Sequence, residues 1–182
     1  MPPSQPQAVL LVDGYNVIGA WSVLEKTRDR DGLEAAREQL IEALVNYSAF
    51  EGLDTQIVFD AHYQDTTCSC EVISPNLSVC YTDFGQTADT YIEKFCASYR
   101  RNVVTPRQRV IVATSDRAQQ LTVVGFGAEW MSAQRLASEV ELTATRRSRS
   151  HLTKKQSSSR FLMNSLDAKA RERLAEMRKG LK

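Results

Sequence analysis

Short apolar runs alternate with longer segments of helical periodicity along most of this chain. Residues 8–12 form a continuous apolar run, which is typical of a strand buried on both faces of a parallel sheet. Two further runs, 55–60 and 109–114, are rich in β-branched residues and predict strands. Because such strands are interleaved with helical segments, the pattern predicts an α/β fold with a central, mostly parallel sheet.

Apolar residues recur every three or four positions in the segments between these runs, which predicts amphipathic helices. One helix is expected over 31–51 and is closed by Gly52. A second is expected from the capping residue Thr87 to about residue 102. Two more are predicted over 115–124 and 132–147.

Three shorter segments complete the predicted sheet. Residues 70–73 and 77–81 flank Pro75-Asn76, which is typical of a hairpin at a sheet edge. Residues 129–131 follow a glycine-containing break and predict one more short strand.

The C-terminal residues differ from the rest of the chain in charge. The net charge is only +1, yet residues 146–182 contain twelve Lys and Arg against three Asp and Glu. Residues 150–159 are polar and Ser-rich, which predicts a flexible linker, and 164–179 predict a short basic helix. We therefore predict a body over 1–149 and a linker with a basic helical tail over 150–182. An acidic body with a basic tail is a pattern that indicates either contact with polyanions or an ordinary solvated helix surface, and charge alone does not distinguish the two.

The composition indicates an ordinary soluble globular protein, with 42% hydrophobic and 25% charged residues. No apolar run is long enough to span a bilayer, and the N-terminus lacks the basic region of a secretory signal. We therefore expect a cytoplasmic protein with no membrane partner. In that location its four cysteines are expected as reduced thiols: Cys68, Cys70, Cys80 and Cys96. A zinc site is not expected, because Cys68-x-Cys70 lacks the usual spacing of zinc ligands.

Carboxylates stand at the ends of the predicted strands. Asp13, Asp60 and Asp116 each end or follow a strand, and Asp89 lies in the first turn of the helix that Thr87 caps. Since the carboxyl ends of parallel strands form the binding crevice of an open α/β sheet, we expect the four carboxylates to meet there.

Each acid also has an ordinary structural interpretation. Asp116 could cap a helix, Asp89 could favour a helix dipole, and Asp60 could start a turn. Grouped carboxylates, however, raise one another's pKa unless a cation neutralises them. An all-oxygen set suits Mg²⁺ or Mn²⁺, which can activate water and stabilise charge on a phosphodiester. Asn16 would orient a water or phosphate oxygen without adding repulsion. No P-loop, dinucleotide motif or nucleophile elbow competes with this interpretation.

Four segments, in this order and spacing, resemble the NYN domains of the PIN-like nuclease superfamily, and most of all the bacterial YacP-like family: LLVDGYNVIGAW, IVFDAH, QTADTYIEK and VATSD. The resemblance covers about residues 8–147. It implies a three-layer PIN-like (NYN) α/β/α fold and an acidic, metal-dependent ribonuclease site. It places that site on Asp13, Asn16, Asp89 and Asp116, with Asp60 as a further member. One YacP-like protein is a ribosome-associated endoribonuclease that cuts mRNA in the ribosomal A site, so mRNA and the ribosome are the implied partners.

The sequence thus predicts a metal-dependent endoribonuclease that acts on single-stranded or ribosome-held RNA and, as the resemblance implies, leaves 5′-phosphate and 3′-hydroxyl ends. Asp13, Asp89 and Asp116 would hold Mg²⁺ or Mn²⁺, while Asn16 and Asp60 would position water and phosphate. The alternative is a non-catalytic RNA- or ribosome-binding module that retains the fold. A small-molecule phosphohydrolase is a third interpretation. Basic residues after the body are predicted to bind RNA: Arg146, Arg147, Arg149, Lys154, Lys155 and Arg160.

Overall fold

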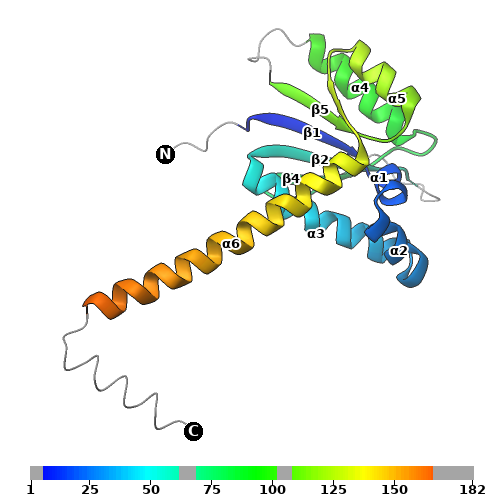
Figure 1. The fold of residues 1–182 in the computed structure, drawn as a ribbon. Coiled ribbons are helices and arrows are strands. Elements are labelled where there is room, and N and C mark those ends of the chain that lie inside the picture. The colour runs from blue at the N-terminus through cyan, green and yellow to red at the C-terminus, as the bar shows by residue number, and fades with distance from the viewer. Residues whose placement is uncertain (1–5, 62–68, 102–107, 166–182) are drawn as a thin grey trace. The chain divides into compact units, whose positions relative to one another are not determined.

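A computed structural model describes residues 6–61, 69–101 and 108–165. The chain divides into two compact units, Met1–Thr143 and Ala144–Lys182. A six-stranded sheet forms the centre of the first unit, in the order β3-β4-β2-β1-β5-β6 (Figure 1). The strands are β1 Ala8–Asp13, β2 Leu53–Phe59, β3 Ser69–Ser74, β4 Leu77–Tyr81, β5 Arg109–Ala113 and β6 Glu129–Met131. The helices are α1 Gly14–Ala20, α2 Ser22–Asp31, α3 Leu33–Glu51, α4 Ala88–Arg101, α5 Arg117–Gly125 and α6 Ala133–Ser165.

The sheet is parallel except at one edge, where β3 runs antiparallel to β4. Every residue of β1 is buried, as expected of a central strand whose two faces are both covered. The predicted α/β fold with a mostly parallel sheet is confirmed.

Helices cover the sheet on both faces. Leu10 and Val12 of β1 pack in one core with residues of α1, α2, α3 and the beginning of α6. Val9 and Leu11 point the other way and pack with residues of α4 and α5. Because successive residues of a strand face opposite sides, β1 contributes to both cores. The result is the predicted three-layer arrangement.

The predicted helix over 31–51 is present as α3 and ends at Gly52, whose φ of 66° is left-handed. The sequence did not predict α1 and α2. The highly charged α2 buries Leu24 alone among its ten residues, so it has no apolar periodicity to detect.

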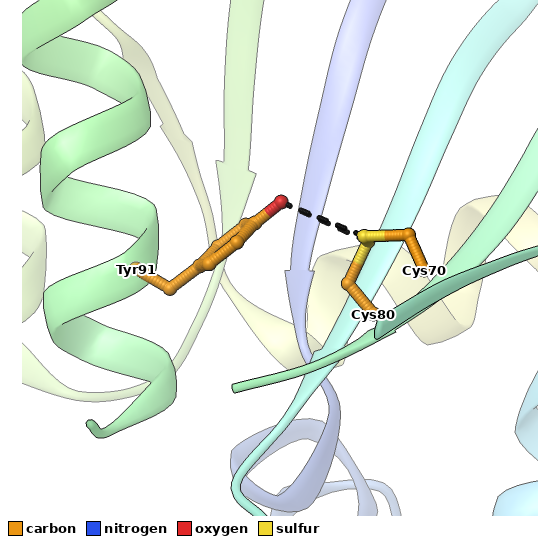
Figure 2. The surroundings of a disulfide bond; sticks show 3 residues. All are labelled: Cys70, Cys80 and Tyr91. Atoms are coloured by element: carbon orange, nitrogen blue, oxygen red, sulfur yellow. Dashed lines mark hydrogen bonds between the residues drawn. A yellow bond between two sulfur atoms is a disulfide. The ribbon is translucent and has the colours of Figure 1, made fainter. Parts of the chain in front are cut away.

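The predicted hairpin at the sheet edge is present as β3 and β4, but the expectation of reduced thiols was wrong. Cys70 and Cys80 are directly opposite in the strand register and form a disulfide, with their Cα atoms 4.1 Å apart (Figure 2). The Tyr91 hydroxyl of α4 lies 3.7 Å from the Cys80 sulfur. Composition could not reveal this pairing, which follows from the register. Cys96 is a buried free thiol, and Cys68 lies outside the described residues.

Helix α6 is continuous from Ala133 to Ser165, so residues 150–159 are helical and the predicted flexible linker was wrong. The segment contains neither Gly nor Pro, and its Ser-rich composition alone does not end a helix. Residues 166–179 of the predicted basic helix lie outside the described residues. No described helix is both long and apolar enough to cross a membrane.

A candidate acidic site at the carboxyl ends of the strands

The topology creates a switch point at the carboxyl end of β1. This strand lies between β2 and β5, and the connections to its two neighbours run on opposite faces of the sheet. Ligands of open α/β sheets bind at such a switch point. Asp13 ends β1, Asp60 follows β2, and Asp116 lies three residues beyond the end of β5.

Asp13 is the most buried of the four acids, with a residue exposure of 7%. It caps α1, and one of its carboxylate oxygens accepts a hydrogen bond of 3.3 Å from the backbone N–H of Asn16. Burial raises the pKa of Asp13 to about 7, and the negative charges of Asp89 and Asp60 contribute to this rise. A carboxyl group with this pKa holds its proton, or a cation in place of it, near neutral pH.

Asp89 lies in the first turn of α4 and is half-buried. Burial raises its pKa, and so do the charges of Asp116 and Asp60. The neighbouring Asp13 carboxyl group and the Gln119 amide act in the opposite direction and lower this pKa. Acids that act on one another in this way disfavour full ionisation together, unless a cation neutralises them.

Asp60 and Asp116 each hold the beginning of a helix. Asp60 accepts a hydrogen bond from the backbone N–H of Ala88, the first residue of α4. Asp116 caps α5 and accepts from the N–H groups of Ala118 and Gln119, at 2.7 and 3.0 Å. The structural interpretation of Asp116 as a cap is therefore correct. Both charges nevertheless act on Asp89 and raise its pKa.

The predicted cap of α4 is also present, because the Thr90 N–H donates to the Thr87 hydroxyl over 3.2 Å. Thr87 and Asp60 therefore both bind N–H groups in the first turn of this helix. Thr87 directly precedes the helix, and Asp60 follows the end of β2. Together they position Asp89.

Asn16 joins two strand ends. Its side-chain oxygen accepts a hydrogen bond of 2.6 Å from the backbone N–H of Ser115, in the loop between β5 and α5. Its backbone, rather than its amide group, faces Asp13. Gly14 permits close packing here, since a Cβ atom at this position would lie 2.2 Å from the ring of Phe59.

The sequence did not point to Gln119, although it lies three residues after Asp116 on α5. Its exposure is 2%, and its side-chain amide makes no hydrogen bond of normal geometry within the described residues. It acts on Asp89 nonetheless, by lowering the pKa of that carboxyl group. We take its contact with Asp89 as electrostatic, because the geometry falls short of a hydrogen bond. A buried glutamine within a helix gives no signal in a sequence.

The chemistry of these donors fits a hard divalent cation. All are oxygens, and burial and like charge raise the pKa of both Asp13 and Asp89. In the part of the chain that the structure describes, no three His, Cys, Asp or Glu side chains are placed to hold one ion. The assignment of Asp13, Asp89 and Asp116 as metal ligands therefore stays a prediction.

The basic residues predicted to bind RNA belong to the second unit. Arg146, Arg147 and Arg149 are exposed on α6. The side chains of Lys154, Lys155 and Arg160 lie outside the described residues.

Comparison with known proteins extends the similarity along nearly the whole chain. The YacP-like NYN domain matches residues 10–179. The uncharacterized protein YacP of Bacillus subtilis (strain 168) is 38% identical over 139 residues, which are 73% of this chain and 75% of that protein. The crystal structure of Rae1 (YacP) from Bacillus subtilis has a TM-score of 0.64 and 33% identity, and the match covers 94% of this chain and 95% of that one. The crystal structure of a mutant form of Rae1 (YacP) from Bacillus subtilis has a TM-score of 0.65 and 31% identity, and the match covers 93% of this chain and 99% of that one.

Proposed function

Because this chain belongs to the YacP-like NYN domain family, whose fold is that of RNA-related nucleases, we propose that it is a metal-dependent endoribonuclease. The observation that carries this proposal is the placement of acids at the carboxyl ends of the strands, where Asp13 and Asp89 shift each other's pKa and the charges of Asp60 and Asp116 act on Asp89. Such a cluster repels a phosphodiester by itself, so it is useful to an RNA-acting protein only when it holds a cation.

In this proposal Asp13, Asp89 and Asp116 hold Mg²⁺ or Mn²⁺, directly or through water. When bound, the ion neutralises the carboxylates, lowers the pKa of water and stabilises charge on the phosphodiester. Asp13, whose pKa is raised to about 7, would release its proton when the ion binds near neutral pH.

The remaining residues orient the substrate. Asp60 keeps the first turn of α4 in place, and Asp89 with it. Asn16 uses its side-chain oxygen to hold the Ser115 loop, and its side-chain NH₂ group is a donor suited to a phosphate oxygen. Both contribute to holding a scissile phosphate at the carboxyl end of β1.

The proposed substrate is single-stranded RNA, and in particular mRNA held by the ribosome, which places the activity in the cytoplasm. The family relationship supports this choice. The basic residues from Arg146 onward supply the attraction that an acidic site cannot. Cleavage leaves a 5′-phosphate and a 3′-hydroxyl end.

The test is cleavage of a 5′-labelled single-stranded RNA by the full chain, in Mg²⁺, in Mn²⁺ and in excess chelator. We expect Asp89→Asn to lower the rate at least about a hundredfold, the scale of removing a main charge-stabilising group. Asp54→Asn makes the same change near the amino end of β2 and should leave the rate within about twofold of the parent, since it removes no such group. Full activity in chelator would rule out the metal-dependent reaction.

A second candidate function has one observation in its favour. Asp60 and Asp116 already serve as helix-capping acceptors, as they would in a non-catalytic RNA- or ribosome-binding module. Such a module would bind RNA equally well with and without divalent metal and would create no new RNA ends. Mapping RNA ends with and without the protein, in free RNA and in translating ribosomes, distinguishes the two.

A further inference from the structure

We propose that an open pocket beside the acidic site binds one nucleotide of a single-stranded RNA, with the base stacked on Trp130 and a phosphate on Arg117. This inference rests on the proposed function and names the part of the protein that holds the substrate next to the scissile bond. The pocket has a volume of about 450 Å³, within the usual range for small-molecule sites. Its lining includes Ser115, Arg117, Gln120, Leu121, Trp130 and Gln134.

Trp130 is a fixed and accessible ring. It lies on the edge strand β6 and remains 37% exposed, whereas Trp21 is 7% exposed. Its indole N–H donates a hydrogen bond of 2.8 Å to the backbone oxygen of Thr114, so the ring orientation is set before any ligand arrives. A rigid, partly exposed aromatic ring is the platform on which single-stranded nucleic acids stack their bases.

One residue, Ser115, connects the pocket with the acidic site. Ser115 lines the pocket, and its backbone N–H donates to the side chain of Asn16. Its hydroxyl contacts Gln134 of α6 on the pocket side. Asp116, the next residue, adds its charge to Asp89. A chain that places a phosphate at the carboxylates therefore has its neighbouring nucleotide within reach of the pocket.

The polar groups of the pocket match a nucleotide. Arg117 is exposed and begins α5, and a guanidinium binds phosphate with paired donors. The amides of Gln120 and Gln134 can both donate to and accept from the edge of a base. Leu121, 69% exposed, adds apolar surface beside the ring.

Binding is measured with the full chain carrying Asp89→Asn, so that the RNA is not cut, and Trp21→Phe, so that Trp130 is the only tryptophan. We expect a short single-stranded oligoribonucleotide to quench Trp130 fluorescence. By anisotropy with a labelled oligonucleotide, Trp130→Ala should weaken binding about 5- to 100-fold, the range for losing one stacked base. Trp130→Phe keeps a stacking face and should stay within about threefold.

Matched controls separate the pocket from general effects. Phe50→Ala removes another exposed aromatic ring, near the amino end of β2, and should leave affinity unchanged. Arg117→Gln should lower the slope of log affinity against log salt by about 0.7, the value for one phosphate contact on a single strand. Lys94→Gln removes the same charge from an exposed position of α4 and should leave the slope unchanged. Thermal melting confirms that each variant is folded.

The outcomes distinguish this inference from the proposed function. If Trp130→Ala binds and cleaves RNA as the parent does, the nucleotide subsite is overturned while the nuclease proposal stands. If no RNA is cleaved under any metal condition, yet quenching and the Trp130→Ala loss are observed, the subsite stands and the nuclease proposal fails. If Trp130→Ala loses ribosome binding but keeps full affinity for the free oligonucleotide, the pocket is a protein-docking surface, and the inference is also overturned.

Discussion

Asp13 combines two properties that rarely occur in one side chain, since it caps a helix and has a pKa of about 7. Its pKa in the folded protein lies above the ordinary value of 3.8 for an aspartate, so between these values the folded state binds more protons than the unfolded one. Stability must therefore fall as pH rises from about 4 to about 7. A bound divalent cation would offset that loss.

We predict that Asp13→Asn raises the melting temperature at pH 7.5 more than at pH 5, because it removes a buried charge that exists only at the higher pH. The same variant should lose cleavage and the stabilisation that Mn²⁺ gives to the parent. Melting curves at both pH values, with and without Mn²⁺, provide the measurement. Asp54→Asn is the control, and equal melting shifts for the two variants would contradict the prediction.

Gln119 gives a prediction of a different kind. Its amide lowers the pKa of Asp89, so Gln119→Met should raise that pKa and move the acid side of the pH–rate profile to higher pH. Because the amide makes no normal hydrogen bond, an apolar side chain of similar size should cost little stability. A lower rate with an unshifted profile would assign Gln119 a purely structural role.

Three of the four acids could be selected from the sequence because they end or follow apolar runs, and Asp89 because it lies in the first turn of a capped helix. Their partners could not be predicted from it. The bond from Ala88 to Asp60 spans 28 positions, and that from Ser115 to Asn16 spans 99. Such bonds depend on which strands are neighbours and on how each side chain is turned, and no local pattern records either.

Among the elements, α1 shows how packing can require a residue that local propensity disfavours. Gly14→Ala should destabilise the protein by about 1–3 kcal/mol, the usual cost of overpacking, because its Cβ would overlap the Phe59 ring. Gly19→Ala makes the same change in the same helix, where the nearest atom is 4.0 Å away. It should stabilise by up to about 1 kcal/mol through helix propensity. Chemical denaturation measures both, and equal effects would refute the packing argument.

The edge hairpin gives the second prediction at this scale. The Cys70–Cys80 bond closes a loop of 10 residues, for which loop entropy implies about 2–3 kcal/mol of stabilisation. Cys70→Ser should therefore lower the melting temperature by roughly 5–10 °C. Dithiothreitol should lower the melting temperature of the parent by the same amount and leave that of the variant unchanged. The variant is thus the control for any effect of the reductant other than breaking this bond. A parent insensitive to the reductant would show that the bond does not form in solution.

The sequence predicted α3 and α4 because each is long and has a clear buried face. It missed α1, which buries Val17 and Ile18 but has only seven residues, and α2, which buries Leu24 alone. For the Ser-rich segment, residues 150–159, the error was the reverse: a helix is present where none was predicted. Its composition indicates a linker, but the absence of Gly and Pro allows α6 to continue through it. A polar composition indicates that side chains are exposed to solvent. It does not show whether the backbone leaves the helical conformation.

At the scale of the whole molecule, the charge is divided between the two parts of the chain. Residues 1–145 carry eleven Lys and Arg against nineteen Asp and Glu, while residues 146–182 carry twelve against three. The compact units divide at nearly the same place, between Thr143 and Ala144. Among the side chains that the structure describes, those of α6 in the core are Ala133, Leu136 and Val140. We therefore expect the core to stay folded when the basic segment is removed.

We predict that a chain ending at Ala144 melts close to the parent but binds single-stranded RNA more weakly, with a flatter dependence of affinity on salt. In the full chain, replacing Arg146, Arg147 and Arg149 with Gln should lower the salt slope by up to about 2, because each phosphate contact on a single strand contributes about 0.7. This triple variant keeps the length of α6, so it separates loss of charge from loss of the helix. Titrations at several salt concentrations measure both effects. Equal affinities and slopes for parent, triple variant and truncated chain would mean that the acidic body obtains its attraction to RNA elsewhere, with Arg117 as the first residue to test.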